Sequence, residues 1–330
     1  MSRRTAGRAT LGIAISVAAV VILVRSVDIG AALEVLSRAD LGAVAVMAVS
    51  VLLDVAARGA RWRALLIPIR RIPYRRVLGY TYVGYLANNV LPARLGELVR
   101  SHALGEGEGL SRTTVLGTVV VERIVDTVIV VALAAVAVVL LGVGGIISTA
   151  VVLGAAFVGI LLIGLVLAVV SHRLPGADRV TAMVERFPLA LDLGRRLRDG
   201  LAVISRPGTV AAALAYSALA WTFSIMTFVI GGRAIGVELT AVQGALLSSG
   251  VALATIVPSG PGYLGTFELT AVGIATQFGV GANEAFAIAL LVHAMILIVT
   301  SAGGAIAALR LRVGLSTGSR DRPDARSEVA

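Results

Sequence analysis

Residues 127–171 contain no Asp, Glu, Lys or Arg, and this run constrains the fold more than any other stretch of the chain. It is more than twice as long as the roughly 20 residues that a helix needs to cross the hydrocarbon core of a bilayer. We therefore expect two spans here, joined by a turn at Gly142-Val-Gly-Gly145. Because hydrophobic residues make up 58% of the sequence, the chain is typical of integral membrane proteins, and we predict an all-α, polytopic fold.

The apolar stretches predict about six full spans. These cover residues 11–24, 41–57, 111–141, the stretch that ends at 172, 209–232 and 285–309. The second is broken near its end by Asp54. The first is either a signal peptide or a helix, and we favour an uncleaved helix because no small-x-small cleavage site follows it. Residues 28–40 alternate apolar and charged positions at helical spacing, which predicts a short amphipathic helix along the outer interface.

All 29 basic residues are arginine, and the net charge is +10. The arginines lie mostly between apolar spans, which indicates the positive-inside bias of a membrane protein rather than a nucleic-acid partner. This rule predicts a multi-pass protein of the cell (inner or plasma) membrane with both termini in the cytoplasm. An amphipathic insertion at 173–208 and a disordered polar tail at 313–330 belong to the same side.

A basic stretch after the second span is the candidate headgroup patch. Arg61, Trp62 and Arg63 predict a surface for anionic lipid headgroups, and Trp62 with Tyr74 is expected to anchor the chain at the membrane interface.

Polar residues interrupt a short apolar helix at Asn88-Asn89-Val-Leu-Pro92-Ala-Arg94-Leu-Gly96-Glu97. The helical stretches on either side, 77–90 and 95–104, are each too short to span a bilayer. Pro92 removes a backbone donor and Gly96 weakens the next turn, so we expect a bend at membrane depth. Two half-length helices predict a re-entrant hairpin that enters and leaves on the cytoplasmic side; one kinked full span is the competing interpretation.

A second stretch repeats this plan. Residues 241–257 lead in, Pro258-Ser-Gly-Pro261-Gly262-Tyr-Leu-Gly265 breaks the helix, and residues 266–278 return, with Glu268 in the first turn. We predict a second hairpin that opens to the other side, or eight spans in all if the hairpins cross. Residues 41–141 and 209–309 then form an inverted repeat within one transmembrane domain of residues 1–312. Broken helices at matching places in two halves point to a transport site near the midplane.

The ionisable residues inside these spans are the candidate site. Each costs about 2.5 to 3.5 kcal/mol at the membrane centre if unpaired, so it must pair or face water. The spacing predicts the pairs Arg94–Glu97 and Arg123–Asp126, with Glu122 and Asp126 on one helix face. In one interpretation these pairs only lock the first hairpin to the next helix. In the other, Arg94 or Arg123 binds a lipid phosphate with its guanidinium fork.

The two breaks supply further candidates, because glycines ahead of a helix start offer amide donors and a positive dipole end to an anion. The letters Gly260-Pro-Gly262-Tyr-Leu-Gly265 match a dinucleotide fingerprint, but its strand–turn–helix context is missing. The predicted substrate-binding set is Asn88, Asn89, Arg94, Glu97, Arg100, Glu122, Arg123, Asp126, Ser259, Gly262 and Glu268. The predicted hinges are Pro92, Gly96, Pro258, Pro261 and Gly265. With no cysteine and no catalytic or metal-ligand motif within the spans, we expect no catalytic residues, metal or cofactor.

Four ordered motifs carry a resemblance. They are Arg58-x-x-Arg61-Trp62-x-x-Leu-Leu66, Asn88-x-x-x-Pro92-x-Arg94-x-Gly96-Glu97-x-x-Arg100, Glu122-Arg123-x-x-Asp126 and Pro258-x-x-Pro261-Gly262-x-x-Gly265-x-x-Glu268. Together they resemble the flippase-like family that shares the membrane region of lysylphosphatidylglycerol synthases, over about residues 10–312.

The resemblance implies a transporter, not an enzyme, that moves a phospholipid or a polyprenyl-phosphate-linked lipid between leaflets. The alternatives are a membrane-embedded transferase on a lipid-phosphate substrate, and a non-transporting accessory subunit of an envelope lipid or glycan pathway. Expected partners are a membrane lipid, envelope-biosynthesis enzymes and a second copy of the chain in a homodimer. Because the aminoacyl-transferase domain of the bifunctional synthases is not in the sequence, we do not expect synthase activity.

Overall fold

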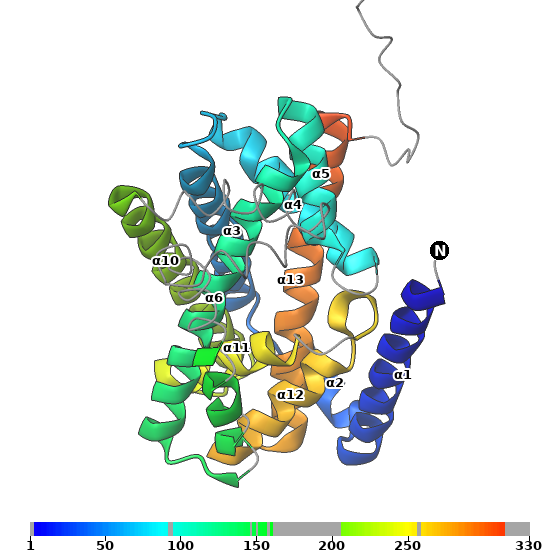
Figure 1. The fold of residues 1–330 in the computed structure, drawn as a ribbon. Coiled ribbons are helices and arrows are strands. Elements are labelled where there is room, and N and C mark those ends of the chain that lie inside the picture. Colours follow the sequence, from blue (N-terminus) through cyan, green and yellow to red (C-terminus); the bar gives the residue numbers. More distant parts are fainter. Residues whose placement is uncertain are drawn as a thin grey trace, which may run out of the picture.

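The computed structural model describes residues 3–91, 95–145, 147–149, 151–156, 159–160, 206–255 and 259–313, with side chains from residue 12 onward. All regular structure in these residues is helical, which confirms the predicted all-α fold. The helices are α1 (Arg3–Ser26), α2 (Ile29–Ser37), α3 (Leu41–Leu66), α4 (Tyr74–Val90), α5 (Gly96–Glu108), α6 (Arg112–Leu141), α10 (Pro207–Ala234), α11 (Ala241–Ala254), α12 (Thr266–Ala275) and α13 (Ala282–Leu311). Two 3-10 turns, η3 (Pro261–Tyr263) and η4 (Thr276–Phe278), complete the list (Figure 1).

Four of the described helices, α3, α6, α10 and α13, are long and apolar enough to cross a membrane. They match four of the six predicted spans. The pair α1 and α2, bent by 83° at a short break, makes a fifth if the two helices form one span. Large apolar side chains such as Val46, Val139, Leu214 and Ile298 lie exposed on these helices, as lipid contact requires. The chain is therefore a multi-pass membrane protein.

The second predicted span was wrong in one respect. Asp54 does not break the helix, because α3 runs without interruption from Leu41 to Leu66. Arg58 lies one turn further along and donates from Nε to both carboxylate oxygens of Asp54, at 2.9 and 3.1 Å. A neutralised carboxylate on a buried helix face is compatible with a continuous span.

Helices α4 and α5 form the first hairpin and lie against each other in antiparallel fashion. Arg76, near the start of α4, donates to the backbone of Gly107 and pairs with Glu108 at the end of α5. Further along, a Cβ at Gly84 of α4 would lie 2.9 Å from Cδ of Arg100 on α5, so only glycine permits this approach. The antiparallel contacts confirm a hairpin rather than one kinked span.

Helices α11 and α12 form the second hairpin, with η3 at its tip. The predicted boundaries agree closely: α11 ends at Ala254, and α12 begins at Thr266 after Gly265, which has a positive φ of 82°. Helix α1 packs on the outside of this tip. Ser16 on α1 accepts a 2.8 Å hydrogen bond from the Gly260 amide, so the tip is held from the lipid side.

The two hairpins pack against different halves of helix α13. At its C-terminal end, Leu311 lies by Gly79 of α4, and nearer the middle Asn89 donates to Thr300 and Ser301 at 2.9 Å. On the N-terminal half, the hairpin α11–α12 packs on α13, and Gly262 of η3 lies by Leu297. The two tips therefore meet near the middle of α13 after entering from opposite ends of the bundle (Figure 1).

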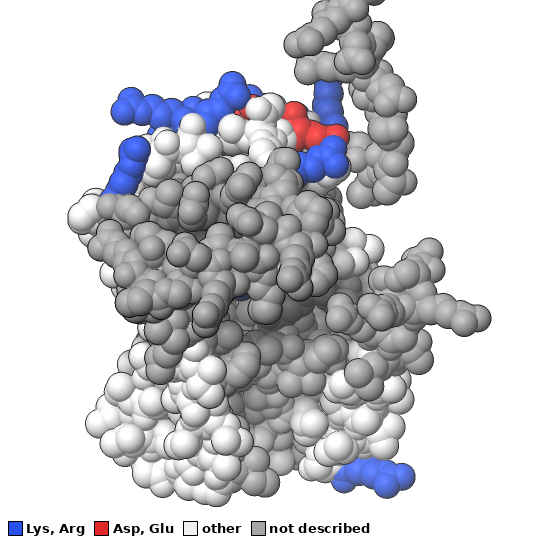
Figure 2. Space-filling view, in the orientation of Figure 1, with Lys and Arg blue, Asp and Glu red and all other residues white. Residues whose placement is uncertain are grey.

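Exposed arginines gather at one end of the bundle, beside the open end of the first hairpin (Figure 2). We name this the arginine-rich end, and its described members are Arg70, Arg71, Arg75, Arg76, Arg112, Arg206, Arg310 and Arg312. Exposed arginines of the spans and loops at the other end are Arg25, Arg38 and Arg233.

Several predictions lie outside the described residues. They concern the hinges Pro92 and Pro258, the candidate Arg94, the insertion at 173–208 except its last residues, and most of the span that ends at 172. The tail beyond Val313 is also outside.

Candidate functional site: a polar cavity between the hairpin tips

A cavity of about 280 Å³ lies where the two hairpin tips meet the long helices. Residues from α4 and α5 line one part of its wall, and residues from α11, η3 and α12 line another. Helices α3, α6, α10 and α13 supply the rest. Of the predicted substrate-binding residues, the cavity wall contains Asn88, Asn89, Glu97, Arg100, Arg123 and Asp126.

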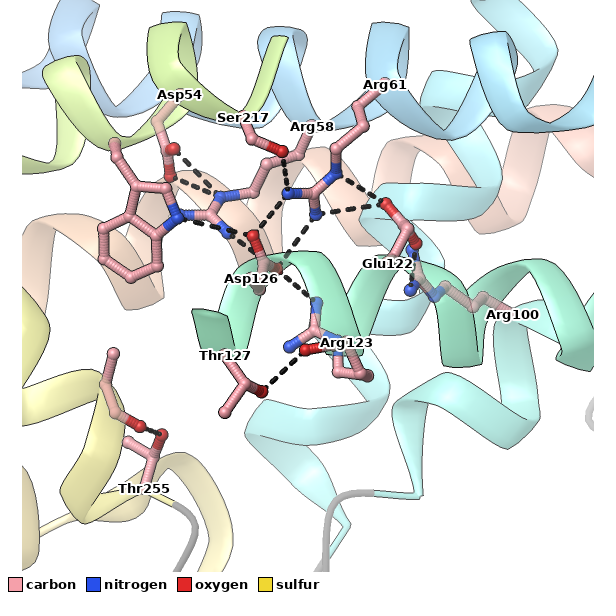
Figure 3. Close-up of polar contacts among 12 residues, drawn as sticks. Asp54, Arg58, Arg61, Arg100, Glu122, Arg123, Asp126, Thr127, Ser217 and Thr255 are labelled. Carbon is pink, nitrogen blue, oxygen red and sulfur yellow. Dashed lines mark hydrogen bonds and ion pairs between the residues drawn. The ribbon is translucent and has the colours of Figure 1, made fainter. Parts of the chain in front are cut away.

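Arg61 on α3 is the centre of a buried ion-pair network beside this cavity (Figure 3). Its guanidinium donates to Glu122 at 3.1 Å and to Asp126 through two nitrogens, of which Nη2 lies 3.0 Å from Oδ2. It also donates to Ser217 of α10 at 3.0 Å. Both acids come from α6, four residues apart, as the sequence predicted. The network thereby joins three spans through one arginine.

Arg58 extends the network toward the cavity. Besides its bonds to Asp54, its Nη1 lies 3.6 Å from the Asp126 carboxylate. Its guanidinium also lies 5.1 Å from the ring centroid of Trp221, whose indole nitrogen is 3.4 Å from Asp126. A cation–π contact with Trp221 and hydrogen bonds to Asp54 thus hold the guanidinium of Arg58 in place.

Arg100 attaches the first hairpin to the network. Its Nη2 lies 2.6 Å from Oε2 of Glu122, and its guanidinium is 4.5 Å from the ring centroid of Trp62. Trp62 itself donates to Thr118 at 3.0 Å. An ion pair thus attaches the first hairpin to α6, but it joins Arg100 to Glu122 and is not one of the two pairs that the sequence spacing predicted.

Arg123 differs from the other arginines of the network in its exposure. Its side chain is 43% exposed and lines the cavity, whereas the side chain of Arg61 is 1% exposed. Its predicted pair with Asp126 is present at 3.2 Å, but its Nε has no hydrogen-bond partner among the described residues. The whole network contains Arg58, Arg61, Arg100, Arg123, Asp54, Glu122 and Asp126. The network thus contains four arginines and three carboxylates, and Glu97 adds a fourth carboxylate to the cavity wall that Arg123 lines.

The two asparagines at the first break have separate tasks. Asn88 accepts a 2.7 Å hydrogen bond from the Gly96 amide, so it satisfies a free N–H at the start of α5. Asn89 ties the tip to α13 through Thr300 and Ser301. Gly96 is buried against Gly84 and Asn88, which explains why a larger residue is absent there.

Glu268 forms two polar contacts at the second break. One carboxylate oxygen accepts a 2.7 Å hydrogen bond from the Gly265 amide, and the other lies 2.6 Å from Nδ1 of His293 on α13. Phe267 stacks on the His293 ring with 4.1 Å between centroids. Ser259 and Gly262 lie at the tip; the Ser259 hydroxyl is buried without a hydrogen-bond partner among the described residues.

The predicted headgroup patch was wrong for two of its three residues. Arg61 and Trp62 are fully buried, because they supply the centre of the ion network and the ring under Arg100. Trp62 is therefore no interface anchor. Arg63 is half-buried and donates to the backbone of Ile72 at 3.1 Å.

Sequence reasoning missed several cavity and network residues, notably Asp54, Arg58, Trp221 and His293. Asp54, Arg58 and Arg61 recur at spacings of four and three, so they share one face of a span, and this signal was available. An ionisable His293 inside an apolar span also calls for a partner. No group of three metal-ligating side chains occurs in the part of the chain that the structure describes.

The family described as the lysylphosphatidylglycerol synthase TM region matches residues 9–304. The chain belongs to this family. It is also 27% identical to the glycosyltransferase AglD of Haloferax volcanii over an alignment that covers 96% of this chain and 56% of AglD. The chain thus spans little more than half the length of that relative. No solved structure matches the chain.

Proposed function

We propose that this protein moves a lipid with an anionic phosphate headgroup between the two leaflets of the membrane. The observation that carries the proposal is the position of Arg123: a guanidinium open to a cavity at the meeting point of two oppositely directed hairpins. A guanidinium stays charged in a poorly hydrated site and matches phosphate oxygens with two parallel donors.

The size of the cavity fits a headgroup and not a whole lipid. At about 280 Å³ it lies below the range of pockets that enclose drug-sized ligands. We infer that the phosphate and the groups next to it enter the cavity, while the acyl or prenyl chains stay in the bilayer. The guanidinium of Arg123 supplies a positive charge in the cavity wall for a phosphodiester, which carries one negative charge.

The two hairpins supply access from opposite sides. By the positive-inside rule the arginine-rich end faces the cytoplasm, so the first hairpin opens inward and the second outward. Small movements of one hairpin against the long helices would connect the cavity to one leaflet at a time, as in transporters built from inverted repeats.

Leaflet exchange in proteoliposomes tests this proposal, with fluorescent phosphatidylglycerol and dithionite quenching of the outer leaflet. We expect Arg123→Gln to slow exchange by about tenfold, the loss that one charge-assisted hydrogen bond predicts. Arg112→Gln is the matched control, because Arg112 lies on the same helix but is exposed at the arginine-rich end. Equal rates for the parent protein and Arg123→Gln, at equal folding, would remove Arg123 from the site. No exchange above empty liposomes, for phosphatidylglycerol or a polyprenyl phosphate, would contradict lipid transport.

A membrane-embedded transferase is the second candidate, because AglD is named a glycosyltransferase and aligns with nearly the whole chain. Turnover of a polyprenyl-phosphate sugar by the purified protein in detergent, with no second compartment, would favour it over transport.

A further inference from the structure

The buried pair of Glu268 and His293, of which His293 lines the cavity, has no part in the proposed lipid site. Glu268 is 4% exposed and His293 is 3% exposed, and Nδ1 and Oε1 are 2.6 Å apart. No arginine forms an ion pair with Glu268 among the described residues. The pair is therefore separate from the arginine network, although His293 lines the same cavity.

The elements around the pair bring few other charges near it. The described residues of α11 contain no ionisable side chain, and Arg25 of α1 and Glu34 of α2 are exposed. Arg233 of α10 is exposed as well. The ionisable side chains that share the cavity wall with His293 are Asp54, Arg58, Tyr85, Glu97, Arg100, Arg123, Asp126 and Tyr263.

One proton changes the charge of this buried pair. With a carboxylate and a neutral imidazole, the pair carries one negative charge; with a second proton on Nε2 of His293, it is neutral as a whole. A net charge is costly in a buried site, and water that enters the site lowers this cost. A change in hydration of the cavity and the binding of this proton are therefore linked.

The same carboxylate caps the start of the helix that follows the second break. The Gly265 amide donates to Glu268 at the start of α12, in a turn where Gly265 has a φ of 82°. His293 belongs to α13, the helix that receives both hairpins. Glu268 thus connects the break of the second hairpin to the central helix through two hydrogen bonds.

We propose that Glu268 and His293 form a proton-binding site that couples protonation to the opening of the second hairpin, with a proton as the coupling ion of transport. The consequence for transport rests on the proposed function, but the proton-linked opening does not. Proton binding stabilises the closed tip as a neutral, dry pair. Proton release leaves a buried negative charge that water entering from the second hairpin's side stabilises.

Maleimide labelling of one cavity cysteine measures this opening without any transport assay. The chain has no native cysteine, and Ser248 on α11 is buried and lines the cavity. The labelling rate of Ser248→Cys is measured at pH about 6 and at pH about 8. At each pH it is divided by the labelling rate of the exposed Ser111→Cys, and this ratio corrects for thiol ionisation. We expect this ratio to rise by about fivefold between the two pH values, as a modest shift in the open population predicts.

Two variants decide whether the pair is responsible. Glu268→Gln keeps an oxygen for the Gly265 amide but removes the charge, and His293→Gln removes the imidazole ring. Each is expected to reduce the pH effect to less than about twofold. His102→Gln is the control, because His102 is half exposed on α5 and should leave the effect unchanged. A pH effect that persists in both variants, or a parent ratio that does not change with pH, would overturn the proposal.

Leaflet exchange under an imposed pH gradient then tests coupling. We expect the gradient to change the exchange rate of fluorescent phosphatidylglycerol by about threefold in the parent protein and not in Glu268→Gln. If the exchange rate of the parent protein does not change with the gradient, proton coupling is contradicted, whereas lipid transport is not. If no exchange occurs at all, the proposed function fails, and the labelling result alone decides the proton-linked opening.

Discussion

Glu122 on α6 and Arg100 on α5 form a buried ion pair, with 2.6 Å between Oε2 and Nη2, and this contact attaches the first hairpin to the helix that follows it. Glu122 also accepts from Arg61 on α3, so one carboxylate balances two arginines. All three side chains are buried, and an unpaired charge inside the bundle is costly. Folding therefore requires that the carboxylate of Glu122 pair with the two arginines.

Replacement of Glu122 should therefore destabilise the protein strongly. We expect Glu122→Gln to lower the free energy of unfolding by about 3 to 5 kcal/mol, the range for removal of one partner from a buried pair. Chemical denaturation in detergent, followed by the helical signal, measures this loss. Glu106→Gln is the control: Glu106 pairs with Arg112 and His102 at the exposed end of α5, so its loss should cost less than about 1 kcal/mol. Similar losses for the two variants would contradict the central position of Glu122.

Close packing of α4 on α13 depends on Gly304. A Cβ at this position would lie 2.8 Å from the carbonyl oxygen of Tyr82, whereas a Cβ at Gly273 of α12 has nothing within 4 Å. Gly304→Ala should destabilise the protein by about 1 to 3 kcal/mol, because α4 must move away from α13. Gly273→Ala should stabilise it by up to about 1 kcal/mol through helix propensity. Thermal unfolding of the two variants in parallel checks the sign, and two changes of equal sign would contradict the observed contact.

Trp221 should report on headgroup binding, since it lines the cavity beside Arg58. The chain has two tryptophans, so Trp62→Phe leaves Trp221 as the sole tryptophan, whose emission can be excited selectively. Titration with a short-chain phosphatidylglycerol should change its emission with a saturable curve. In the same background, Arg123→Gln should raise the half-saturation concentration by about tenfold, the effect of about 1.4 kcal/mol. A linear response in both proteins would indicate partition into the detergent micelle instead of a site.

Much of this architecture follows from the sequence, because its causes are local. The bends after Val90 and Ala254 are marked by half-length apolar helices and by glycines, and the structure has them within a few residues of the predicted positions. Their meeting at one cavity was also predicted, from the symmetry of the two breaks. The spacing of Glu122 and Asp126 indicated a shared helix face, which the common partner Arg61 confirms.

The partners across the bundle were not predictable in the same way. Arg61 lies 61 and 65 residues from its two acids, and the local spacing that places it on one helix face with Asp54 and Arg58 does not say which distant acids it meets. The arginine-rich sequence around it favoured a surface patch, but α3 continues past Asp54 and turns Arg61 into the bundle. Which face of a long helix is buried depends on its neighbours, and the pairing of Glu268 with His293 depends on them too.

The central claim is that the two hairpins share one cavity with access from both sides, and the sidedness of cysteine labelling tests it most directly. Thr81→Cys on α4 and Ser248→Cys on α11 place thiols in the cavity wall from the first and second hairpin. Exposed Ser111→Cys and Ser37→Cys mark the two ends of the bundle. In oriented vesicles treated with an impermeant maleimide, the account predicts that both cavity thiols are labelled from either side, while each end marker is labelled from one side alone. Labelling of Thr81→Cys from one side and of Ser248→Cys only from the other would reveal two separate pockets and contradict the account.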